Sequence, residues 1–438
     1  MISTQIVDSR MIPAATRERK KHFGELDSLR GIAALAVVFY HWYHLFPDTY
    51  SKSIIGRLFE LTPLQLLIGG HSSVILFYVL SGFVLSLPQV RGTAVQYPSY
   101  LLKRVCRIYL PYLTALLLAI LGCAAFHGLN AYDEWFQLTW HQAPSWKLVL
   151  QHLLFIGNYD DSAYNTAFWS LVQEMRISIL FPVLAFAVIR LRAAGAALLA
   201  VALVALAIWF DAKSSIPFTY SRTVACGGIF ILGILLSLYL PKLQSTLRSL
   251  PTIPWFGLLL ACFALYIYSP LVGFHLGLAK PAIDFVLAIG AAGIILYSLS
   301  TERISRFLLH SSISFLGRIS YSVYLLHGTV LFVFAYVCFG RVAPTVWLVP
   351  YLAVTLGAAI LLHRYVEIPS IQLGKALDLK LRSIRDYGRL SLANAGKAEM
   401  MSLSGSPQAT VSKSAAGANG VLSQPGKPRQ TPQWKDGR

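Results

Sequence analysis

Ten stretches of mostly apolar residues run through this 438-residue chain. A helix needs about 20 such residues to cross the hydrocarbon core of a bilayer, since its backbone rises about 1.5 Å per residue. Helices also satisfy their own backbone hydrogen bonds in lipid. The sequence therefore predicts an all-α, polytopic membrane protein with ten transmembrane helices, near residues 29–46, 72–90, 108–127, 170–189, 193–210, 223–240, 254–270, 282–299, 319–339 and 345–364.

The composition agrees with a membrane protein and argues against a soluble enzyme. Hydrophobic residues make up 56% of the chain and charged residues only 13%, about half the share typical of soluble domains. The net charge of +18 does not indicate nucleic-acid binding, because the basic residues gather at the chain ends and thinly between the apolar runs. That distribution is typical of a protein whose partners include membrane lipids.

The lysines and arginines also predict the orientation. With a cytoplasmic N-terminus, 29 of the 37 basic residues fall on the cytoplasmic side and seven in outer loops, as the positive-inside rule requires. Both termini are then expected in the cytoplasm, with the protein in the inner membrane if the cell is bacterial. We expect a cytoplasmic lead (1–24), a transmembrane domain (25–374) and a basic cytoplasmic tail (375–438) whose polar, Ser-, Gly- and Pro-rich composition predicts extensive disorder.

The first predicted span carries several ionisable residues, and two of them, Arg30 and His41, stand out by their spacing. Such residues are costly inside a membrane and are functional candidates by default. Arg30 and His41 are eleven residues apart, almost three helical turns, so they share one face at a separation of about 16 Å. Arg30 is either a topology signal or a ligand-binding cation. His41 is either a hydrogen-bonded interior histidine or a base that takes a proton from a hydroxyl near neutral pH.

Further polar residues lie in or beside the spans. Ser81 precedes Gly82 in the second span, where small residues favour close helix packing. Arg104 and Arg107 are three residues apart on one helical face, where they would bind phosphates, although a contact with lipid headgroups is an equally good interpretation. Glu174 is an intramembrane carboxylate near the start of the fourth span. Arg176 does not face it, so each needs another partner.

The ninth predicted span carries a polar stripe. Ser320, Tyr324 and His327 share one helical face, which indicates a cavity lining rather than a lipid contact. The five cysteines form no CxxC motif or Cys–His cluster. We therefore expect no disulfide, no metal site and no bound cofactor.

Six short motifs occur in an order typical of one family. The motifs are Leu26-Asp-Ser-Leu-Arg-Gly31 with ten residues between Arg30 and His41, Phe77-Tyr-Val-Leu-Ser-Gly-Phe83, Arg104-Val-Cys-Arg107, Trp169-Ser-Leu-Val-Gln-Glu174, Ile319-Ser-Tyr-Ser-Val-Tyr-Leu-Leu-His327 and Glu367-Ile-Pro369. With these motifs, the chain resembles the acyltransferase-3 family of integral membrane acyltransferases over about residues 25–374. Each alone is weak, whereas all six in order are specific. Tyr78 departs from the Phe often found at its position, and Met175-Arg176 departs after Glu174.

The resemblance implies ten core helices and the transfer of an acyl group, often acetyl, to hydroxyls of exported or cell-envelope glycans. The donor implied is acyl-CoA, with acetyl-CoA favoured, used as a co-substrate from the cytoplasm. The acceptor implied is a carbohydrate or a lipid-linked glycan. Arg104 and Arg107 would hold the CoA phosphates, Arg30 would bind or orient the donor, and His41 would sit at the reacting centre as general base. Glu174 joins His41 as a catalytic candidate, and Ser81, Ser320, Tyr324 and His327 are expected to line the cavity.

The sequence leaves a mechanistic choice and a different function open. Direct transfer, an acyl intermediate and an acyl relay across the membrane all use the same residues. A secondary transporter or flippase for a glycan or anion would also use these intramembrane charges. No inverted repeat of the kind many transporters carry is visible, which disfavours that alternative. Consumption of the thioester separates an enzyme from a transporter.

Overall fold

The computed structural model describes residues 23–45, 54–93, 95–128, 136, 138–155, 158–213, 218–338 and 341–404, and this part of the chain is all-α. The chain divides into two compact units, Met1–Leu381 and Arg382–Arg438. The helices are α1 (Gly24–His44), α3 (Ile54–Leu61), α4 (Gly70–Val90), α5 (Tyr97–Arg104), α6 (Leu110–Phe126), α8 (Trp146–Leu154), α9 (Phe168–Asp211), α10 (Phe218–Ser249), α11 (Thr252–His275), α12 (Lys280–Ser300), α13 (Glu302–Leu308), α14 (Ser311–Cys338), α15 (Pro344–Leu362) and α16 (Ile368–Ser404). Short helical segments also occur at Pro63–Leu67, Val105–Tyr109 and His363–Glu367.

Eight helices within the described residues are long and apolar enough to cross a membrane, which indicates an integral membrane protein. Their bounds are Gly70–Val90, Tyr97–Phe126, Phe168–Asp211, Phe218–Ser249, Thr252–His275, Lys280–Ser300, Ser311–Cys338 and Thr345–Arg385. The apolar runs of the sequence predict two spans, 170–189 and 193–210, in the region of α9. The structure has a break there, because Arg192 has a positive φ of 58° within the 44-residue helix.

The first predicted span corresponds to α1, which is 21 residues long but is not among the eight apolar helices. Its charged and aromatic polar residues make it less apolar than the other spans. With α1 and the two parts of α9, the described helices match the ten predicted spans one for one. The count of ten crossings and the side on which the termini lie remain predictions.

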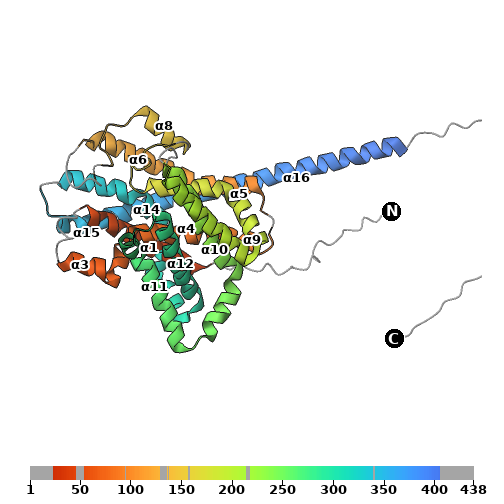
Figure 1. Ribbon diagram of the computed structural model, residues 1–438. Coiled ribbons are helices and arrows are strands. Elements are labelled where there is room, and N and C mark those ends of the chain that lie inside the picture. Colours follow the sequence, from red (N-terminus) through yellow and green to blue (C-terminus); the bar gives the residue numbers. More distant parts are fainter. Residues whose placement is uncertain are drawn as a thin grey trace, which may run out of the picture. The chain divides into compact units, whose positions relative to one another are not determined.

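Helix α1 packs against α4, α12, α13 and α14 (Figure 1). Its buried residues are mostly small and branched, such as Ala33, Ala34, Val37 and Val38. Small side chains let neighbouring backbones approach closely, which is how helices associate in lipid. The helix that carries Arg30 and His41 is therefore enclosed by other helices over much of its surface.

Two glycines fix how α1 lies against α14. A Cβ added to Gly31 would stand 2.5 Å from the backbone nitrogen of Gly317, and one added to Gly317 would stand 2.5 Å from the carbonyl oxygen of Asp27. Ten residues further along each helix, His41 meets His327. Equal spacing between two contacts means that α1 and α14 run parallel and in register. The glycine contact therefore sets the approach of the two histidines.

Helix α16 crosses the predicted boundary between the transmembrane domain and the tail. It runs without interruption from Ile368 to Ser404 and contributes to both compact units. Residues 1–22 and 405–438, which hold most of the predicted lead and half of the predicted tail, lie outside the described residues. The disorder proposed for the tail remains a prediction.

Candidate active site

Two cavities lie along α1 and α4. The first, of about 340 Å³, is lined by Arg30, Arg104 and Arg107 and is called the arginine cavity. The second, of about 390 Å³, is lined by His41 and His71 and is called the histidine cavity. The arginine cavity is lined by the N-terminal part of α1 and mostly the C-terminal part of α4. The histidine cavity is lined by the C-terminal part of α1 and the N-terminal part of α4. In the predicted orientation, the arginine cavity is the cytoplasmic one.

Arg104 is bonded to protein groups inside the arginine cavity. Its Nη2 donates to Oε1 of Glu174 at 2.9 Å and to Oγ of Ser178 at 2.8 Å. Ser81 donates its hydroxyl to the same Glu174 oxygen at 3.2 Å. The partner that the sequence requires for Glu174 is therefore Arg104, and Ser81 belongs to the same cluster.

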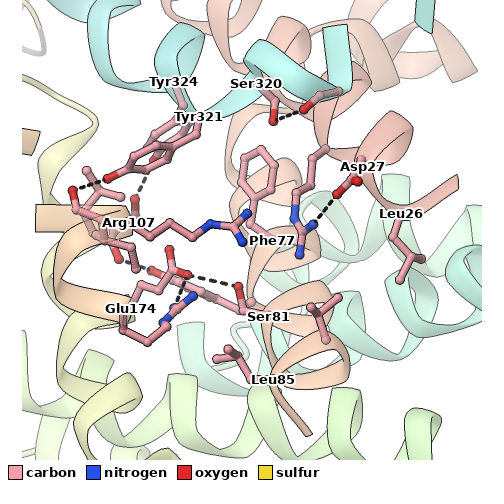
Figure 2. A pocket seen from close by; sticks show the side chains of 18 of the residues that line it. Leu26, Asp27, Phe77, Ser81, Leu85, Arg107, Glu174, Ser320, Tyr321 and Tyr324 are labelled. Carbon is pink, nitrogen blue, oxygen red and sulfur yellow. Dashed lines mark hydrogen bonds and ion pairs between the residues drawn. The ribbon is translucent and has the colours of Figure 1, made fainter. Parts of the chain in front are cut away.

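Arg107 differs from Arg30 and Arg104 in its protein partners. It lies in a π-helical turn, Val105–Tyr109, that interrupts the run from α5 to α6; such turns are frequent at functional sites. Figure 2 shows its guanidinium reaching into the cavity near Phe77. Across the described part of the chain, no carboxylate comes within 4.0 Å of it, whereas Arg30 pairs with Asp27 at 2.8 Å. Arg107 and Arg318 thus line this cavity without a carboxylate partner in the described chain, and the guanidinium of Arg107 is the one seen to reach into the cavity.

A second π-helical turn, His363–Glu367, also reaches the arginine cavity. Glu367 is buried and accepts a hydrogen bond from Ser322 at 2.7 Å. His363 lies 2.9 Å from the same oxygen. The cavity lining therefore holds the cations Arg30, Arg104, Arg107 and Arg318 and the carboxylates Asp27, Glu174 and Glu367, an excess of one positive charge.

Val74, Tyr78 and Tyr324 line both cavities and form the wall between them. The wall is held by hydrogen bonds to α9. The hydroxyls of Tyr324 and Ser170 are 2.5 Å apart, and the Tyr78 hydroxyl donates to the Ser170 carbonyl at 3.2 Å. None of these groups carries a formal charge at neutral pH.

Behind this wall, His41 and His327 form a buried pair. Nδ1 of His41 lies 2.9 Å from Nε2 of His327, and the rings stack with centroids 5.0 Å apart. Nδ1 of His327 faces the carbonyl oxygens of Tyr324 at 2.7 Å and Val323 at 3.2 Å. Carbonyls only accept, so we assign the His327 proton to Nδ1. Nε2 of His327 is then the acceptor, Nδ1 of His41 is the donor, and Nε2 of His41 carries a lone pair.

Asn165 holds the turn of α14 that carries His327. Its Nδ2 donates to the Leu325 carbonyl at 3.0 Å and to the Thr329 hydroxyl at 3.1 Å, and its Oδ1 accepts from the backbone N–H of Ala167. A Cβ added to Gly328 would stand 2.5 Å from Asn165 Oδ1. Asn165 is not among the predicted site residues, because its partners on α14 are 160 and 164 residues away in the sequence.

Most of the predicted site residues gather at these cavities. Arg30, Ser81, Arg104, Arg107, Glu174, Ser320 and Tyr324 line the arginine cavity, and His41 and Tyr324 line the histidine cavity. His327 is fully buried and lines neither, because it packs behind His41. Among the described residues, no group of three or more His, Cys, Asp or Glu side chains is arranged to hold a metal.

The histidine cavity also holds charged residues that the sequence analysis does not single out. Nε2 of His71 contacts Oδ1 of Asp284 at 2.6 Å, and Arg222, Lys280 and Asp211 line the same cavity. A signal for Asp284 is present in the sequence, since it is an acid within the predicted span 282–299. Its partner His71 is the residue just before the second predicted span, 72–90. Only an ionisable residue inside a span is a functional candidate by default, so the sequence gives no such signal for His71.

The loop between α8 and α9 contributes Ser162 and Thr166 to the histidine cavity, and two residues with shifted pKa values lie in this loop and on α8. Burial raises the pKa of Asp161 to about 6, and Arg222 and Arg176 oppose that rise. Burial lowers the pKa of His152, on α8, to about 4. Both residues are therefore uncharged over a wider pH range than in water.

A comparison with known protein families finds a match over most of the chain. A family described as an acyltransferase domain matches residues 23–364, about three quarters of the chain. No curated protein and no solved structure matches the chain. The matched range begins just before α1 and ends in the π-helical turn after α15, so it contains nearly all of the lining of both cavities.

Proposed function

Because the chain belongs to the acyltransferase-3 family and is therefore a transferase, we propose that it moves an acyl group, acetyl in the first instance, from acyl-CoA to a hydroxyl of an exported or cell-envelope glycan. The observation that carries this proposal is the pair of cavities that share one wall, with His41 on one side and the arginines on the other. A donor and an acceptor can then bind from opposite sides of the membrane and meet at the wall.

The arginine cavity is the proposed donor site. Arginine presents a planar fork of donors that suits phosphate oxygens. Arg107 would contact the donor phosphates directly, since its guanidinium reaches into the cavity and is not engaged by a carboxylate of the described chain. Arg104 is engaged by Glu174 and Ser178, so its proposed role is to hold Glu174 and shape the site. Arg30, on α1, would orient the donor.

The acyl end of the donor would reach His41 at the wall formed by Val74, Tyr78 and Tyr324. His41 does not line the arginine cavity, so the thioester must extend past these side chains or displace them. The hydrogen-bonded hydroxyls of Ser170 and Tyr324 lie at this point and could contact the acyl carbonyl.

His41 is the proposed general base. Its Nε2 takes the proton of the acceptor hydroxyl while that oxygen attacks the thioester carbonyl carbon. The carbon–sulfur bond then breaks, and the CoA thiolate leaves and takes the proton back from the His41 imidazolium. His327 accepts the hydrogen bond from Nδ1 and holds His41 in the required tautomer. A positioned base contributes about 10²- to 10⁴-fold to the rate.

Inverted membrane vesicles supplied with radiolabelled acetyl-CoA test this proposal. Wild type should deposit base-labile acetyl label on envelope glycans, and His41→Ala should deposit at least about 100-fold less. His44→Ala is the matched control, because His44 lies on the same helix, bonds the Tyr40 carbonyl and lines neither cavity. Equal labelling by wild type and His41→Ala would refute the role of His41. Glycan movement without thioester consumption would instead support a transporter or flippase.

A further inference from the structure

Arg222, on α10, occupies the histidine cavity in an unusual setting. Its guanidinium carbon lies 4.2 Å from the ring centroid of Phe218 and 5.2 Å from that of Trp169. The side chain is half-buried. Aromatic rings attract a cation over their faces but cannot accept the in-plane N–H groups of a guanidinium. Those donors therefore need an acceptor from elsewhere.

The acidic residues near Arg222 do not supply that acceptor. Asp284 contacts His71 at 2.6 Å and interacts with Arg222 only at longer range. Asp161 also interacts with Arg222 at longer range, and it lines neither cavity. Within the described residues, no carboxylate oxygen comes within 4.0 Å of the Arg222 guanidinium. A half-buried cation without an ion pair is costly in a low-dielectric site, which is the setting expected of a cation that binds a charged ligand.

The surroundings of Arg222 suit a sugar that bears a negative charge. Lys280, at the start of α12, adds a second cation to the lining. Trp169 lines the same cavity with its aromatic ring. The centroid of this ring lies 6.4 Å from that of the His71 ring, and the two rings are stacked. Asp211 and Asp284 provide oxygens for hydroxyl groups. Apolar ring faces, hydroxyls and an anion therefore each find a partner in one cavity.

We propose that Arg222, assisted by Lys280 and Trp169, forms an acceptor subsite for an anionic glycan, in which the guanidinium binds a sugar carboxylate or phosphate. This inference rests on the proposed function, because it assigns the histidine cavity to the acceptor. The anion is held by Arg222 while another hydroxyl of the same glycan lies at His41, which lines the same cavity.

The test compares three soluble probes that differ at C6 only. They are a β-1,4-linked glucose tetrasaccharide, its glucuronate counterpart and its 6-phosphorylated counterpart. Each is titrated into purified full-length protein in nanodiscs and followed by microscale thermophoresis, at low and at physiological salt. The glucuronate or the phosphorylated probe should bind at least about tenfold more tightly than the neutral one, as expected for charge-assisted bonds to a guanidinium. The arm that shows the gain identifies the anion.

Variants separate the role of Arg222 from a general effect of charge. Arg222→Gln should abolish the preference for the anionic probe, and Arg222→Lys should retain part of it. Arg190→Gln is the matched control, because Arg190 also lies over an aromatic ring, Phe186 at 5.1 Å, but lines neither cavity. Equal binding of neutral and anionic probes, no binding of either anionic probe, or a preference that survives in Arg222→Gln would each overturn the proposal.

The outcome is independent of the acyl-transfer assay. Thermal unfolding of each variant shows that a lost preference is not a lost fold. Acetyl transfer that depends on His41 but proceeds equally well on neutral glycans would keep the proposed function and overturn the anionic subsite. An anionic preference without thioester consumption would keep the subsite and overturn acyl transfer.

Discussion

Replacing His327 with phenylalanine tests how the buried histidine pair works. His327 is fully buried, and its Nε2 is the acceptor for His41 Nδ1 at 2.9 Å. Phenylalanine keeps an aromatic ring in the same space but cannot accept this hydrogen bond. His327→Gln is the conservative partner variant, since its amide oxygen can accept the bond.

The expected size of the effect follows from the charge that develops on His41. In the ground state, the His41–His327 hydrogen bond joins two neutral groups. When His41 becomes an imidazolium in the transition state, the same bond becomes charge-assisted, and such bonds contribute about 1.5–3 kcal/mol. The variant also loses the neutral bond of the ground state, which contributes about 0.5–1.5 kcal/mol, so the barrier should rise by the difference of about 1–1.5 kcal/mol. The value of kcat should therefore fall by about 5- to 13-fold. The KM for the donor should change little, because His327 does not line the arginine cavity.

The assay is the initial rate of base-labile acetyl transfer in inverted vesicles, at matched protein abundance and varied acetyl-CoA. His327→Gln should recover much of the rate that His327→Phe loses. Residues that act as one unit lose activity together, so His41→Ala with His327→Phe should be no slower than His41→Ala alone.

Three results would refute this reasoning. An unchanged kcat in His327→Phe would mean that the hydrogen bond to His41 does not support catalysis. A loss that glutamine does not restore would mean that His327 acts through packing rather than through hydrogen bonding. Losses that multiply in the double variant would mean that the two histidines act independently.

Three further predictions concern the donor site, the contact between α1 and α14, and the buried His152 of α8. Arg107→Gln should raise the KM for acetyl-CoA at least about tenfold, measured from initial rates, with little change in melting temperature. Arg104→Gln should also lower the melting temperature in thermal unfolding, because it leaves the Glu174 carboxylate without its ion-pair partner. Gly317→Ala should lower the free energy of unfolding, measured in denaturant titrations, by about 1–3 kcal/mol, because its Cβ would stand 2.5 Å from a carbonyl oxygen of α1. Gly357→Ala is the control, since no atom lies within 4 Å of the Cβ that it adds, and it should change the free energy of unfolding by less than about 1 kcal/mol. Burial lowers the pKa of His152 to about 4. The neutral His152 therefore stabilises the fold fully above the unfolded pKa of about 6.5, and this stabilisation is lost as the pH falls toward 4. Between about pH 7 and pH 5, wild type should lose about 2 kcal/mol more free energy of unfolding than His152→Gln, as followed by thermal unfolding.

The helices were predictable from the sequence because membrane crossing depends on a local property. A run of about 20 apolar residues indicates a span without knowledge of its neighbours, and each predicted span has a helix. The break in α9 is also local, since Arg190 and Arg192 interrupt the apolar run where the structure has its positive-φ residue. The length of α16 was not predictable from composition, because a polar sequence rich in Leu, Ala and Lys is compatible with both helix and disorder.

The pairing of the site residues was not predictable from spacing. His41 and His327 are 286 residues apart, and His71 and Asp284 are 213 apart. Helical periodicity places a side chain on one face of its own helix, but not opposite a given neighbour. The family resemblance groups Arg104 with Arg107, whereas the structure gives them different partners. Arg104 pairs with Glu174, and Arg107, in the π-helical turn at Val105–Tyr109, pairs with no carboxylate of the described chain.

The distribution of charge accounts for how one membrane protein can hold a phosphorylated donor and a hydrophilic acceptor at once. Formal charges line both cavities, but the wall of Val74, Tyr78 and Tyr324 carries none. Moving a charge through such a wall is costly, whereas an uncharged acyl thioester is not opposed in this way. On the proposed mechanism, the donor phosphates stop at Arg107 and the acceptor anion stops at Arg222. The acyl group alone can then pass between the two cavities, which places the reaction at His41.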